Sequence, residues 1–464
     1  ARRARELGAG GRWRGGGIVT GLFQAQPLTG IDHKHFVIGF CGVGFSTHAV
    51  ELALGKSPDV AINHDPKAIA IHQLNHPGMI HLCDDVWNVS RVWDIPRGPV
   101  RGIWISPACQ MHSQAFNCKA TPREEQQRAL CEVLIPFLDE RRPEVAFLEN
   151  VAPFEDWGPL DEHGDPIEAK LGTYFDNFVK DIRARGYSCE WRILNSADYG
   201  MPQSRRRLYM ICRADGRPPV WPEPTHGPGL LPYVPALGCL DFSLPTRPIW
   251  NYVQRNGTPG HTVATHRRMA TGFVKFCLER PPIIVDEAAW IGAWNGNGEH
   301  AKQAPRTWDL LSPLPTSMAG GVKQRLCAFW LRKDNGRTWG QSLDEPMHTV
   351  TCKDTKRLMR LRLGEESSPK VRAWFAKWLP DVPPILPVNG VDYPIADITE
   401  RLLHPRELAR SMGIPDSYKL PPKNTAAIRG VGNGVTVEPA ASIVRANVEP
   451  LETWVPPRRK GRAA

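Results

Sequence analysis

The sequence lacks the features of a membrane protein and of a disulfide-rich or zinc-binding protein. None of its apolar runs approaches the ~20 residues that a helix needs to span a bilayer. Its 11 cysteines form no Cys-x-x-Cys pair, and the chain shows no signal-peptide pattern, which favours reduced thiols over a disulfide framework or a zinc cluster. We therefore expect a cytoplasmic protein with no membrane and no metal ion among its partners.

A glycine is also missing from the turn that would identify a dinucleotide-binding protein. Gly42 and Gly44 follow an apolar run, but Thr47 stands where the dinucleotide fingerprint has its third glycine. This absence disfavours NAD binding. The two glycines still allow the backbone to approach a nucleotide-like ligand at the carboxyl edge of a sheet, although an ordinary tight turn would have the same sequence.

The charge of the chain is unbalanced toward the basic side. Its 464 residues carry a formal net charge of +10, which favours a polyanionic partner because Lys and Arg release condensed counterions from phosphates. A basic protein without a nucleic-acid role remains the alternative. The Arg- and Gly-rich residues 1–31 and the basic residues 447–464 show little periodicity, and we expect both tails to be disordered.

Residues 36–212 alternate short apolar runs with helical patterns, which is typical of a doubly wound, mostly parallel α/β sheet. The predicted strands are residues 36–40, 60–62, 103–105 and 145–148. One helix between them is marked by a capping box at residues 121–124 and by an apolar face of Leu130, Val133, Leu134, Phe137 and Leu138. Pro136 should kink this helix.

The middle of the chain has a different composition. From residue 222 to about residue 394, Pro, Gly, Trp and basic residues prevail with weak periodicity, which predicts a smaller inserted domain. Helical patterns return at residues 404–412, where Gly413 and Pro415 should stop a short helix, and at residues 435–444. The expected order is a tail (1–31), a catalytic sheet domain (32–221), the insertion (222–394), a return to the sheet domain (395–446) and a tail (447–464).

Cys109 is the first candidate for chemistry. It follows the apolar residues 103–105 and Pro107, at the strand end where an open α/β sheet places a nucleophile. A thiol with a pKa near ~8.5 is mostly protonated at pH 7, so a helix N-terminus or cationic side chains would have to lower its pKa. A buried, inert cysteine is the alternative for this residue considered alone.

Polar residues also follow the next predicted strand and a later segment. Glu149 comes directly after residues 145–148, where a carboxylate can reach the same crevice, and a solvent-facing cap is the alternative. Gln203, Arg205 and Arg207 alternate along the chain, so in a strand all three point to one face. A solvated basic stripe is the other interpretation of these residues.

Five segments, in this order, resemble the DNA (cytosine-5) methyltransferase family. They are Phe40-Cys41-Gly42-Val43-Gly44, Pro107-Ala108-Cys109-Gln110, Leu148-Glu149-Asn150-Val151, Gln203-Ser204-Arg205-Arg206-Arg207 and Gly432-Asn433-Gly434-Val435. The resemblance implies the fold of the S-adenosylmethionine-dependent methyltransferases. It also implies transfer of a methyl group to C5 of a flipped cytosine through a covalent Cys109 intermediate, a reaction found in restriction-modification enzymes.

The resemblance assigns roles to individual residues. Glu149 would donate to N3 of the cytosine, Arg205 would face the carbonyl oxygen of the base or the thiolate, and Arg207 would brace the loop. The residues expected to contact the substrate are Gln110, Asn150, Gln203 and Arg207. Those expected to bind S-adenosylmethionine are Phe40, Gly42, Gly44, Asn63, His64, Asp85, Val86, Asn433 and Gly434.

Three residues depart from the family pattern. Asn63 stands where the family typically has a glutamate for the ribose hydroxyls, Phe45 replaces a second glycine, and Ala108 replaces one of two prolines. An amide can still hydrogen-bond two hydroxyls, so the ribose contact can survive with less charge assistance. Phe45 predicts a change in the shape of the glycine turn, and Ala108 predicts a less rigid loop before Cys109.

The implied partner is double-stranded DNA, bound by a monomer whose insertion reads the sequence. The residues expected to make these contacts are Gln324, Arg325, Trp330, Arg332, Lys333, Arg337, Thr338 and Trp339. A solvated basic surface is the alternative for these residues. For the whole chain, the alternatives are an RNA cytosine-5 methyltransferase and a catalytically silent DNA-binding homologue.

Overall fold

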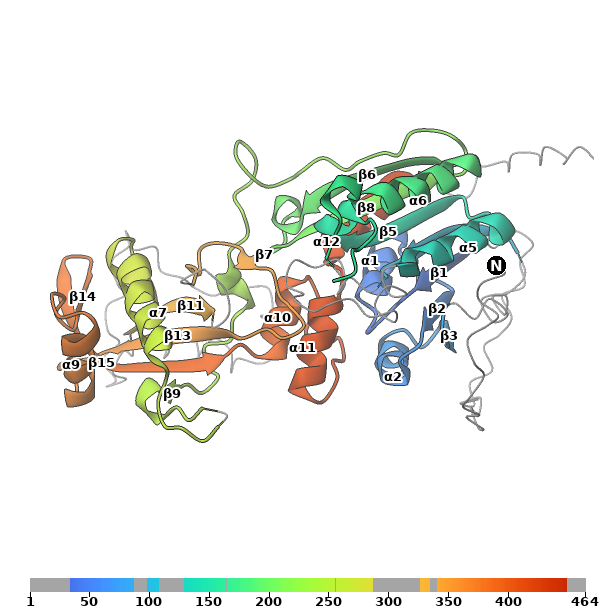
Figure 1. The fold of residues 1–464 in the computed structure, drawn as a ribbon. Coiled ribbons are helices and arrows are strands. Elements are labelled where there is room, and N and C mark those ends of the chain that lie inside the picture. Colours follow the sequence, from blue (N-terminus) through green and yellow to red (C-terminus); the bar gives the residue numbers. More distant parts are fainter. Residues whose placement is uncertain are drawn as a thin grey trace, which may run out of the picture. The chain divides into compact units, whose positions relative to one another are not determined.

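The computed structural model describes residues 34–86, 98–107, 129–163, 165–254, 256–286, 326–333 and 340–448. Within these residues the chain forms two large sheets, each packed against helices (Figure 1). The tail at residues 1–31, nearly all of the tail at 447–464 and the capping box at 121–124 lie outside the described residues. The expectations for those segments therefore stay predictions.

The first sheet has seven described strands in the order β3-β2-β1-β4-β5-β8-β6. These strands are β1 (His35–Gly39), β2 (Val60–Asn63), β3 (Ile80–Cys83), β4 (Val100–Ile105), β5 (Val145–Val151), β6 (Ser188–Asn195) and β8 (Arg206–Arg213). Neighbours from β3 to β5 run parallel, whereas β8 is antiparallel to both β5 and β6. The strand order reverses at β1 and β4, and ligands of open α/β sheets bind at the carboxyl ends of the strands beside such a point.

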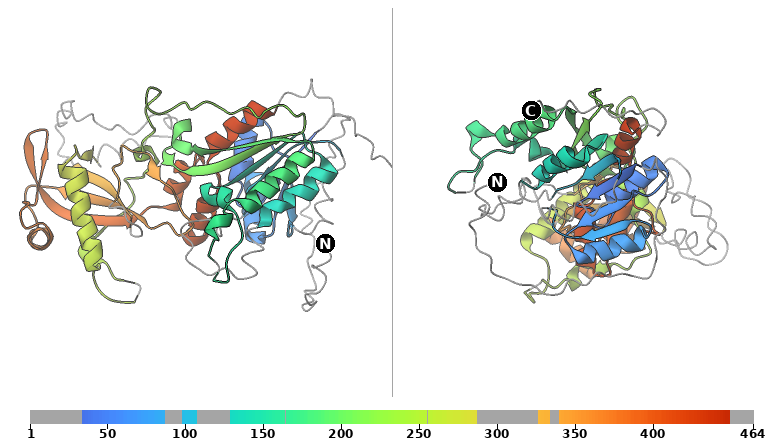
Figure 2. Two further views of the ribbon diagram at one scale, coloured as in Figure 1. Left: turned by 45° about the horizontal axis from the view of Figure 1, so that its top comes forward. Right: turned by 90° about the vertical axis from the view of Figure 1, so that its right-hand side faces the viewer.

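Helices cover both faces of the first sheet, which confirms the predicted doubly wound fold. Every residue of β1, β4 and β5 is buried, as expected for parallel strands between two helical layers. One layer contains α1 (Phe45–Leu54), α2 (Pro66–Asn75) and α12 (Val437–Asn447), and the other contains α5 (Leu134–Arg141) and α6 (Thr173–Ala184). Figure 2 shows α12 beside α1, although they come from opposite ends of the described chain.

All four strands predicted from the sequence form, with boundaries that differ by a few residues. The helix with the predicted apolar face is described from residue 129 onward and consists of two helical pieces. A short 3-10 helix, η3 (Ala129–Val133), precedes α5. Pro136 lies in the first turn of α5, where the missing backbone N–H has no helical partner to lose.

The second sheet is antiparallel and contains six described strands. They are β9 (Arg247–Pro248), β10 (Ile283–Asp286), β11 (Leu326–Lys333), β13 (Lys356–Leu363), β14 (Ile385–Val388) and β15 (Val391–Leu402). On one face the sheet packs against α7 (Val263–Phe273), the π-helical turn η9 (Val274–Leu278) and α9 (Pro369–Trp378). Strand β15 continues to Leu402, beyond residue 394 where the insertion was expected to end.

Two residues of the second sheet do not lie where the sequence predicted. Trp330 and Arg332 were expected to contact DNA, but each is only 1% exposed. The indole of Trp330 lies against Gly272 of α7, and Nη2 of Arg332 forms a 3.0 Å ion pair with Oε2 of Glu400. The prediction is wrong for these two side chains because both are part of the folded interior.

The remaining described elements are short. They are β7 (Gln203–Ser204), which pairs in parallel with β12 (Met347–His348), and the 3-10 helices η4 (Ala152–Asp156), η5 (Glu168–Lys170), η6 (Ser196–Tyr199), η7 (Ala236–Cys239) and η8 (Ile249–Asn251). The pairing of β7 with β12 joins a segment next to the first sheet to one next to the second. The two sheets are therefore connected by hydrogen bonds as well as by the chain.

The C-terminal helices are α10 (Pro405–Ser411), α11 (Asn424–Asn433) and α12. The expected short helix is confirmed, and Gly413 follows it with a positive φ of 87°. The boundary predicted for the last helix is wrong: Asn433 ends α11, and α12 begins at Val437 rather than at Val435. Gly434 and Thr436 are extended, so this segment separates two helices instead of opening one.

Candidate active site

The carboxyl ends of β4 and β5 lie together at one edge of the first sheet. Ile105, the last residue of β4, pairs with Leu148 in β5, so Glu149 lies beside the point where the chain leaves β4. Cys109 and Gln110 follow shortly after β4 but lie outside the described residues. Their placement at this edge stays a prediction.

Glu149 is buried at this edge, with an exposed fraction of 5%. Burial raises the pKa of its carboxyl group, because a charge is poorly solvated in the interior. The guanidinium groups of Arg207 and Arg205 and a hydrogen bond with Ser106 offset only part of that rise in pKa. A buried carboxyl group that retains its proton can donate a hydrogen bond to an acceptor nitrogen.

Arg207 and Arg205 bind different partners. Nε of Arg207 lies 3.3 Å from Oε1 of Glu149, so these two side chains form an ion pair. Arg205 is 2% exposed, and its two terminal nitrogens donate at 2.8 to 3.0 Å to the backbone carbonyl oxygens of Val350, Gly432 and Gly434. The structure thus places Arg207 beside the acid, while Arg205 holds two distant segments of backbone, one at Val350 and one at Gly432 and Gly434.

Gln203 and Asn150 are held inside the structure. Gln203 is fully buried, and its Nε2 donates to Oγ of Ser411 in α10 at 3.0 Å. Asn150 is 2% exposed, and its Oδ1 accepts from the N–H of Val151 at 2.8 Å. Both amides therefore contact neighbouring protein groups at the same edge of the sheet.

The glycine turn leads from β1 into α1 and has unusual backbone angles. Phe40, Gly42 and Gly44 have positive φ values of 56°, 53° and 101°. The N–H of Gly44 donates to the carbonyl oxygen of Cys41 at 2.9 Å and closes the turn. Because α1 begins at Phe45, its first unpaired N–H groups lie at the carboxyl edge of the sheet.

Phe45, which replaces the expected second glycine, is buried beside the turn. It is 1% exposed, and its ring meets that of Tyr418 edge to face at a centroid distance of 5.7 Å. A Cβ atom added to Gly434 would collide with the Phe45 ring. The absence of a side chain at Gly434 is what leaves room for Phe45.

The end of β2 carries the residues expected at the ribose. Oδ1 of Asn63 accepts from the N–H of Asp65 at 2.9 Å, so this oxygen belongs to the local turn. The amide NH₂ group of Asn63 is the part that can donate to a ribose hydroxyl. His64 and Asp85 are exposed nearby, and Val86 is buried.

Asn433, the last residue of α11, and Gly434, which follows it, lie next to residues from three other parts of the chain. Oδ1 of Asn433 accepts from Sγ of Cys352 at 2.6 Å. The carbonyl oxygen of Gly434 accepts from Arg205, and its Cα faces Phe45. This segment is therefore fixed against the glycine turn, as a segment that closes a cofactor pocket would need to be.

Tyr418 and His76, for which the sequence gives no functional signal, contact the glycine turn. The hydroxyl of Tyr418 donates to the carbonyl oxygen of Val43 at 2.8 Å and lies 2.9 Å from Nε2 of His76. Tyr418 and Val43 are 375 positions apart. No periodicity or spacing in the sequence could have indicated this contact.

The nine cysteines that the structure describes are free thiols. No group of three or more His, Cys, Asp or Glu side chains in this part of the chain could hold a metal ion. None of the described helices has the length and apolar character that crossing a membrane requires.

Known proteins are similar to parts of this chain. Residues 38–226 and 322–449 match the model of the family described as C-5 cytosine-specific DNA methylase. Type II methyltransferase M.AgeI of Thalassovita gelatinovora is 28% identical over 195 residues, which cover 40% of this chain and 41% of that protein. Type II methyltransferase M.AquIA of Picosynechococcus sp. is 26% identical over 196 residues, or 41% of this chain and 72% of that protein.

The fold is also shared with a solved structure. A mutant of DNMT2 from Spodoptera frugiperda superposes with a TM-score of 0.50 and 15% sequence identity, over 90% of this chain and 100% of that chain. At this identity the likeness concerns the fold alone. The family model, in contrast, matches well over half of the sequence and spans both the first sheet and the C-terminal return. The chain therefore belongs to the C-5 cytosine-specific DNA methylase family.

Proposed function

We propose that the protein is a DNA (cytosine-5) methyltransferase that takes its methyl group from S-adenosylmethionine. The observation that supports this most is the buried Glu149, with a raised pKa, beside the end of the strand that leads to Cys109. A nucleophile next to a proton-donating acid is what addition to cytosine C6 needs. Membership of the family gives this pair its substrate.

In the proposed reaction the thiolate of Cys109 adds to C6 of a cytosine that has been flipped out of the duplex. The Sγ–C6 bond forms, and the C5–C6 π electrons move to C5 while Glu149 donates its hydrogen bond or proton to N3. S-adenosylmethionine supplies an electrophilic methyl group to C5. S-adenosylhomocysteine leaves, the C5 proton is lost to solvent, N3 returns its proton to Glu149, the Sγ–C6 bond breaks, and Cys109 is released as the thiolate.

The residues at the carboxyl edge fit a nucleoside with a polar chain. Gly42 and Gly44 have no side chains, which allows their positive φ values and lets a ligand approach the backbone of the turn. The NH₂ group of Asn63 offers a donor to the ribose hydroxyls, and the exposed carboxylate of Asp85 offers an acceptor to an amino group. These four residues, with Phe40, would hold the donor.

The two arginines would act differently from the sequence-based expectation. Arg207 pairs with Glu149, so it would orient the acid and face the base. Arg205 donates to three carbonyl oxygens, so it would brace the segments around the site. This assignment exchanges the roles that were expected for Arg205 and Arg207.

Double-stranded DNA is the proposed substrate, with recognition in the second sheet and its loops. Arg362 is exposed on β13, and Arg247 is exposed on β9. Exposed cations of this kind can contact phosphates, whereas the buried Arg332 cannot. Sequence specificity would then depend on neighbouring loops as well.

The test is bisulfite sequencing of DNA from cells that express the protein, compared with cells that express Cys109→Ser. We expect methylated cytosines in one sequence context with the wild type and none with Cys109→Ser, because a serine hydroxyl is a far weaker nucleophile at pH 7. Binding of S-adenosylhomocysteine should survive in the variant. Methylation of RNA instead of DNA by the purified protein, or equal activity of both proteins, would contradict the proposal.

A further inference from the structure

The carbonyl group of Val43, in the middle of the glycine turn, is held by a side chain from the far end of the chain. The hydroxyl of Tyr418 donates to this oxygen at 2.8 Å. Tyr418 is 6% exposed, so water does not compete freely for the carbonyl. The bond from Gly44 to Cys41 closes the turn, and the bond from Tyr418 fixes its centre at Val43.

The hydroxyl of Tyr418 is itself fixed by His76. Since a hydroxyl has one proton, donation to Val43 leaves its oxygen to accept from Nε2–H of His76 at 2.9 Å. Nδ1 of His76 lies 2.8 Å from Oε1 of Glu51 in α1. Burial opposes ionisation of Glu51, but hydrogen bonds from His48, His76 and Ser57 outweigh it and hold the pKa of Glu51 at about 2.

Gly44 shows how closely Tyr418 and His76 pack against the glycine turn. A Cβ atom at Gly44 would collide with the hydroxyl of Tyr418 and would lie 2.8 Å from Nε2 of His76. The φ of 101° at this glycine also disfavours any side chain. The turn therefore lies directly on Tyr418 and His76, without a layer of other side chains between them.

The backbone around Tyr418 is fixed from two sides. From the end of α2, the side chain of Asn75 accepts from the N–H of Lys419 at 2.7 Å and donates to its carbonyl oxygen at 3.0 Å. From α10, Arg406 donates to the carbonyl oxygen of Tyr418 at 2.6 Å and to that of Pro415 at 3.1 Å. The tyrosine is thus carried on a segment with little freedom to move.

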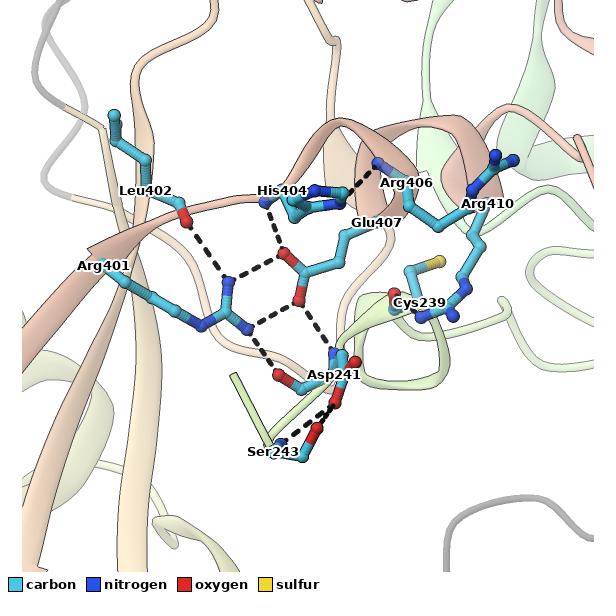
Figure 3. Close-up of polar contacts among 9 residues, drawn as sticks. All are labelled: Cys239, Asp241, Ser243, Arg401, Leu402, His404, Arg406, Glu407 and Arg410. Atoms are coloured by element: carbon cyan, nitrogen blue, oxygen red, sulfur yellow. Dashed lines mark hydrogen bonds and ion pairs between the residues drawn. The ribbon is translucent and has the colours of Figure 1, made fainter. Parts of the chain in front are cut away.

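A buried ion pair connects α10 to the second sheet. Figure 3 shows the two-pronged contact between the guanidinium of Arg401, in β15, and the carboxylate of Glu407, in α10, at 2.7 and 2.8 Å. The same carboxylate accepts from the backbone N–H groups of Asp241 and His404. Hydrogen bonds and α10 therefore form a continuous connection from the second sheet to the glycine turn.

We infer that Tyr418, supported by His76, is a positioning residue that holds the Gly42–Gly44 turn in the conformation that binds the methyl donor. The inference rests on the proposed function, because it assigns the turn to S-adenosylmethionine. Tyr418 acts through the Val43 carbonyl and does not touch the reacting atoms. Loss of its hydroxyl should weaken donor binding and leave the chemistry at Glu149 and Cys109 in place.

The test uses Tyr418→Phe in the full chain, with Tyr187→Phe as the matched control. Tyr187 is also buried, and its hydroxyl donates to the carbonyl oxygen of Pro143 at 2.8 Å, away from the glycine turn. Calorimetric titration with S-adenosylhomocysteine should give a Kd that is about three- to tenfold higher for Tyr418→Phe and unchanged for Tyr187→Phe. KM for the donor should rise by a similar factor, while kcat at saturating donor stays near the wild-type value.

A second pair of variants protects the test against a folding defect. In His76→Gln the side-chain amide can donate a hydrogen bond as Nε2–H does, so the affinity for S-adenosylhomocysteine should stay near the wild-type value. His76→Leu has no such N–H group. Its affinity should fall to the same extent as that of Tyr418→Phe. Wild-type affinity in Tyr418→Phe, or equal weakening in Tyr187→Phe, would overturn the inference alone. A wild-type protein that binds no S-adenosylhomocysteine would overturn the proposed function as well.

Discussion

Two buried glutamates, one in each large sheet, respond to burial in opposite ways. Glu149 in β5 is 5% exposed and Glu400 in β15 is fully buried. Burial raises the pKa of Glu149, and its cationic neighbours offset only part of the rise. Burial acts in the same direction on Glu400, but a hydrogen bond from His261 and the charges of Arg332 and Arg357 outweigh it and lower the pKa.

The difference lies in the number and geometry of the partners. Oε1 of Glu400 is 3.0 Å from Nη1 of Arg357 and 3.1 Å from Nε2 of His261, and Oε2 is 3.0 Å from Nη2 of Arg332. Within the part of the chain that the structure describes, Glu149 has one ion pair, with Nε of Arg207 at 3.3 Å. The acid in the second sheet is therefore compensated and stabilises the fold. The acid in the first sheet is undercompensated, a state that costs stability and that the proposed function would use for chemistry.

The first test of this comparison is Glu149→Gln. We expect kcat for DNA methylation to fall by about 10²- to 10⁴-fold, because the amide cannot transfer a proton. Stability should be unchanged or higher at pH 7. A raised pKa in the folded state means that the native carboxyl group costs stability as pH rises above its ordinary pKa of about 4.3, and the variant lacks this cost.

Urea unfolding at several pH values measures the stability of Glu149→Gln. The variant should gain stability over the wild type as pH rises from about 4, and the difference should vanish at lower pH. Full activity of the variant would remove Glu149 from the mechanism. A large loss of stability at pH 7 would show that the carboxylate is needed for folding after all.

The second test is Glu400→Gln, for which the effect should be on stability. We expect the free energy of unfolding to fall by about 3–5 kcal/mol, because Arg332 and Arg357 would keep their buried charges without the compensating carboxylate. The sign of the pH dependence is opposite to that of Glu149. The stabilising effect of Glu400 is present above its ordinary pKa and is lost as pH falls through its lowered folded pKa.

Asp139→Asn is the control for Glu400→Gln. The side chain of Asp139 is 50% exposed in its ion pair with Arg185, so its loss should change stability by less than about 1 kcal/mol. Urea midpoints at pH 7 compare the two variants directly. If Glu400→Gln unfolds at the wild-type midpoint, the buried charges around Glu400 do not stabilise the second sheet.

The third and smallest test asks whether the site in the first sheet depends on shape as well as charge. Gly434→Ala should cost about 1–3 kcal/mol, because the new Cβ would collide with the ring of Phe45. Gly238→Ala, where no atom lies within 4 Å of the new Cβ, should be near neutral. Thermal unfolding with and without S-adenosylhomocysteine measures both stability and donor binding.

A smaller residue at position 45 should restore what Gly434→Ala loses. In the double variant Phe45→Ala, Gly434→Ala, the second substitution should cost less than it does alone, which a double-mutant cycle measures. Strict additivity of the two free-energy changes would show that Phe45 and Gly434 do not share one space.

The two sheets also differed in how far the sequence predicted them. In the first sheet, all four predicted strands form, because strands buried on both faces are continuous apolar runs and have a strong signal. In the second sheet, β13 reads Lys-Arg-Leu-Met-Arg-Leu-Arg-Leu, and its charges conceal a mostly buried strand. The sequence cannot show that Arg357 is buried, since its partner Glu400 is 43 residues away.

The candidate site was predictable to a similar degree. The glycine turn, Glu149, and the segments around Arg205 and Gly434 were identified from motifs whose chemistry is local. The partners of the two arginines were not predictable, because Arg205 and Arg207 carry the same charge and stand two residues apart in an alternating pattern. Only the antiparallel pairing of β5 with β8 decides that Arg207 faces Glu149.

By itself, the sequence determined the doubly wound fold, the family and the identity of the residues at the strand ends, because each depends on short segments with their own periodicity or motif. The tertiary structure alone decided which charges are compensated and which side chains support the glycine turn. Tyr418 reaches Val43 across 375 residues, and Arg205 reaches Gly434 across 229. Such contacts follow from the path of the chain through two sheets, and no local pattern of residues encodes them.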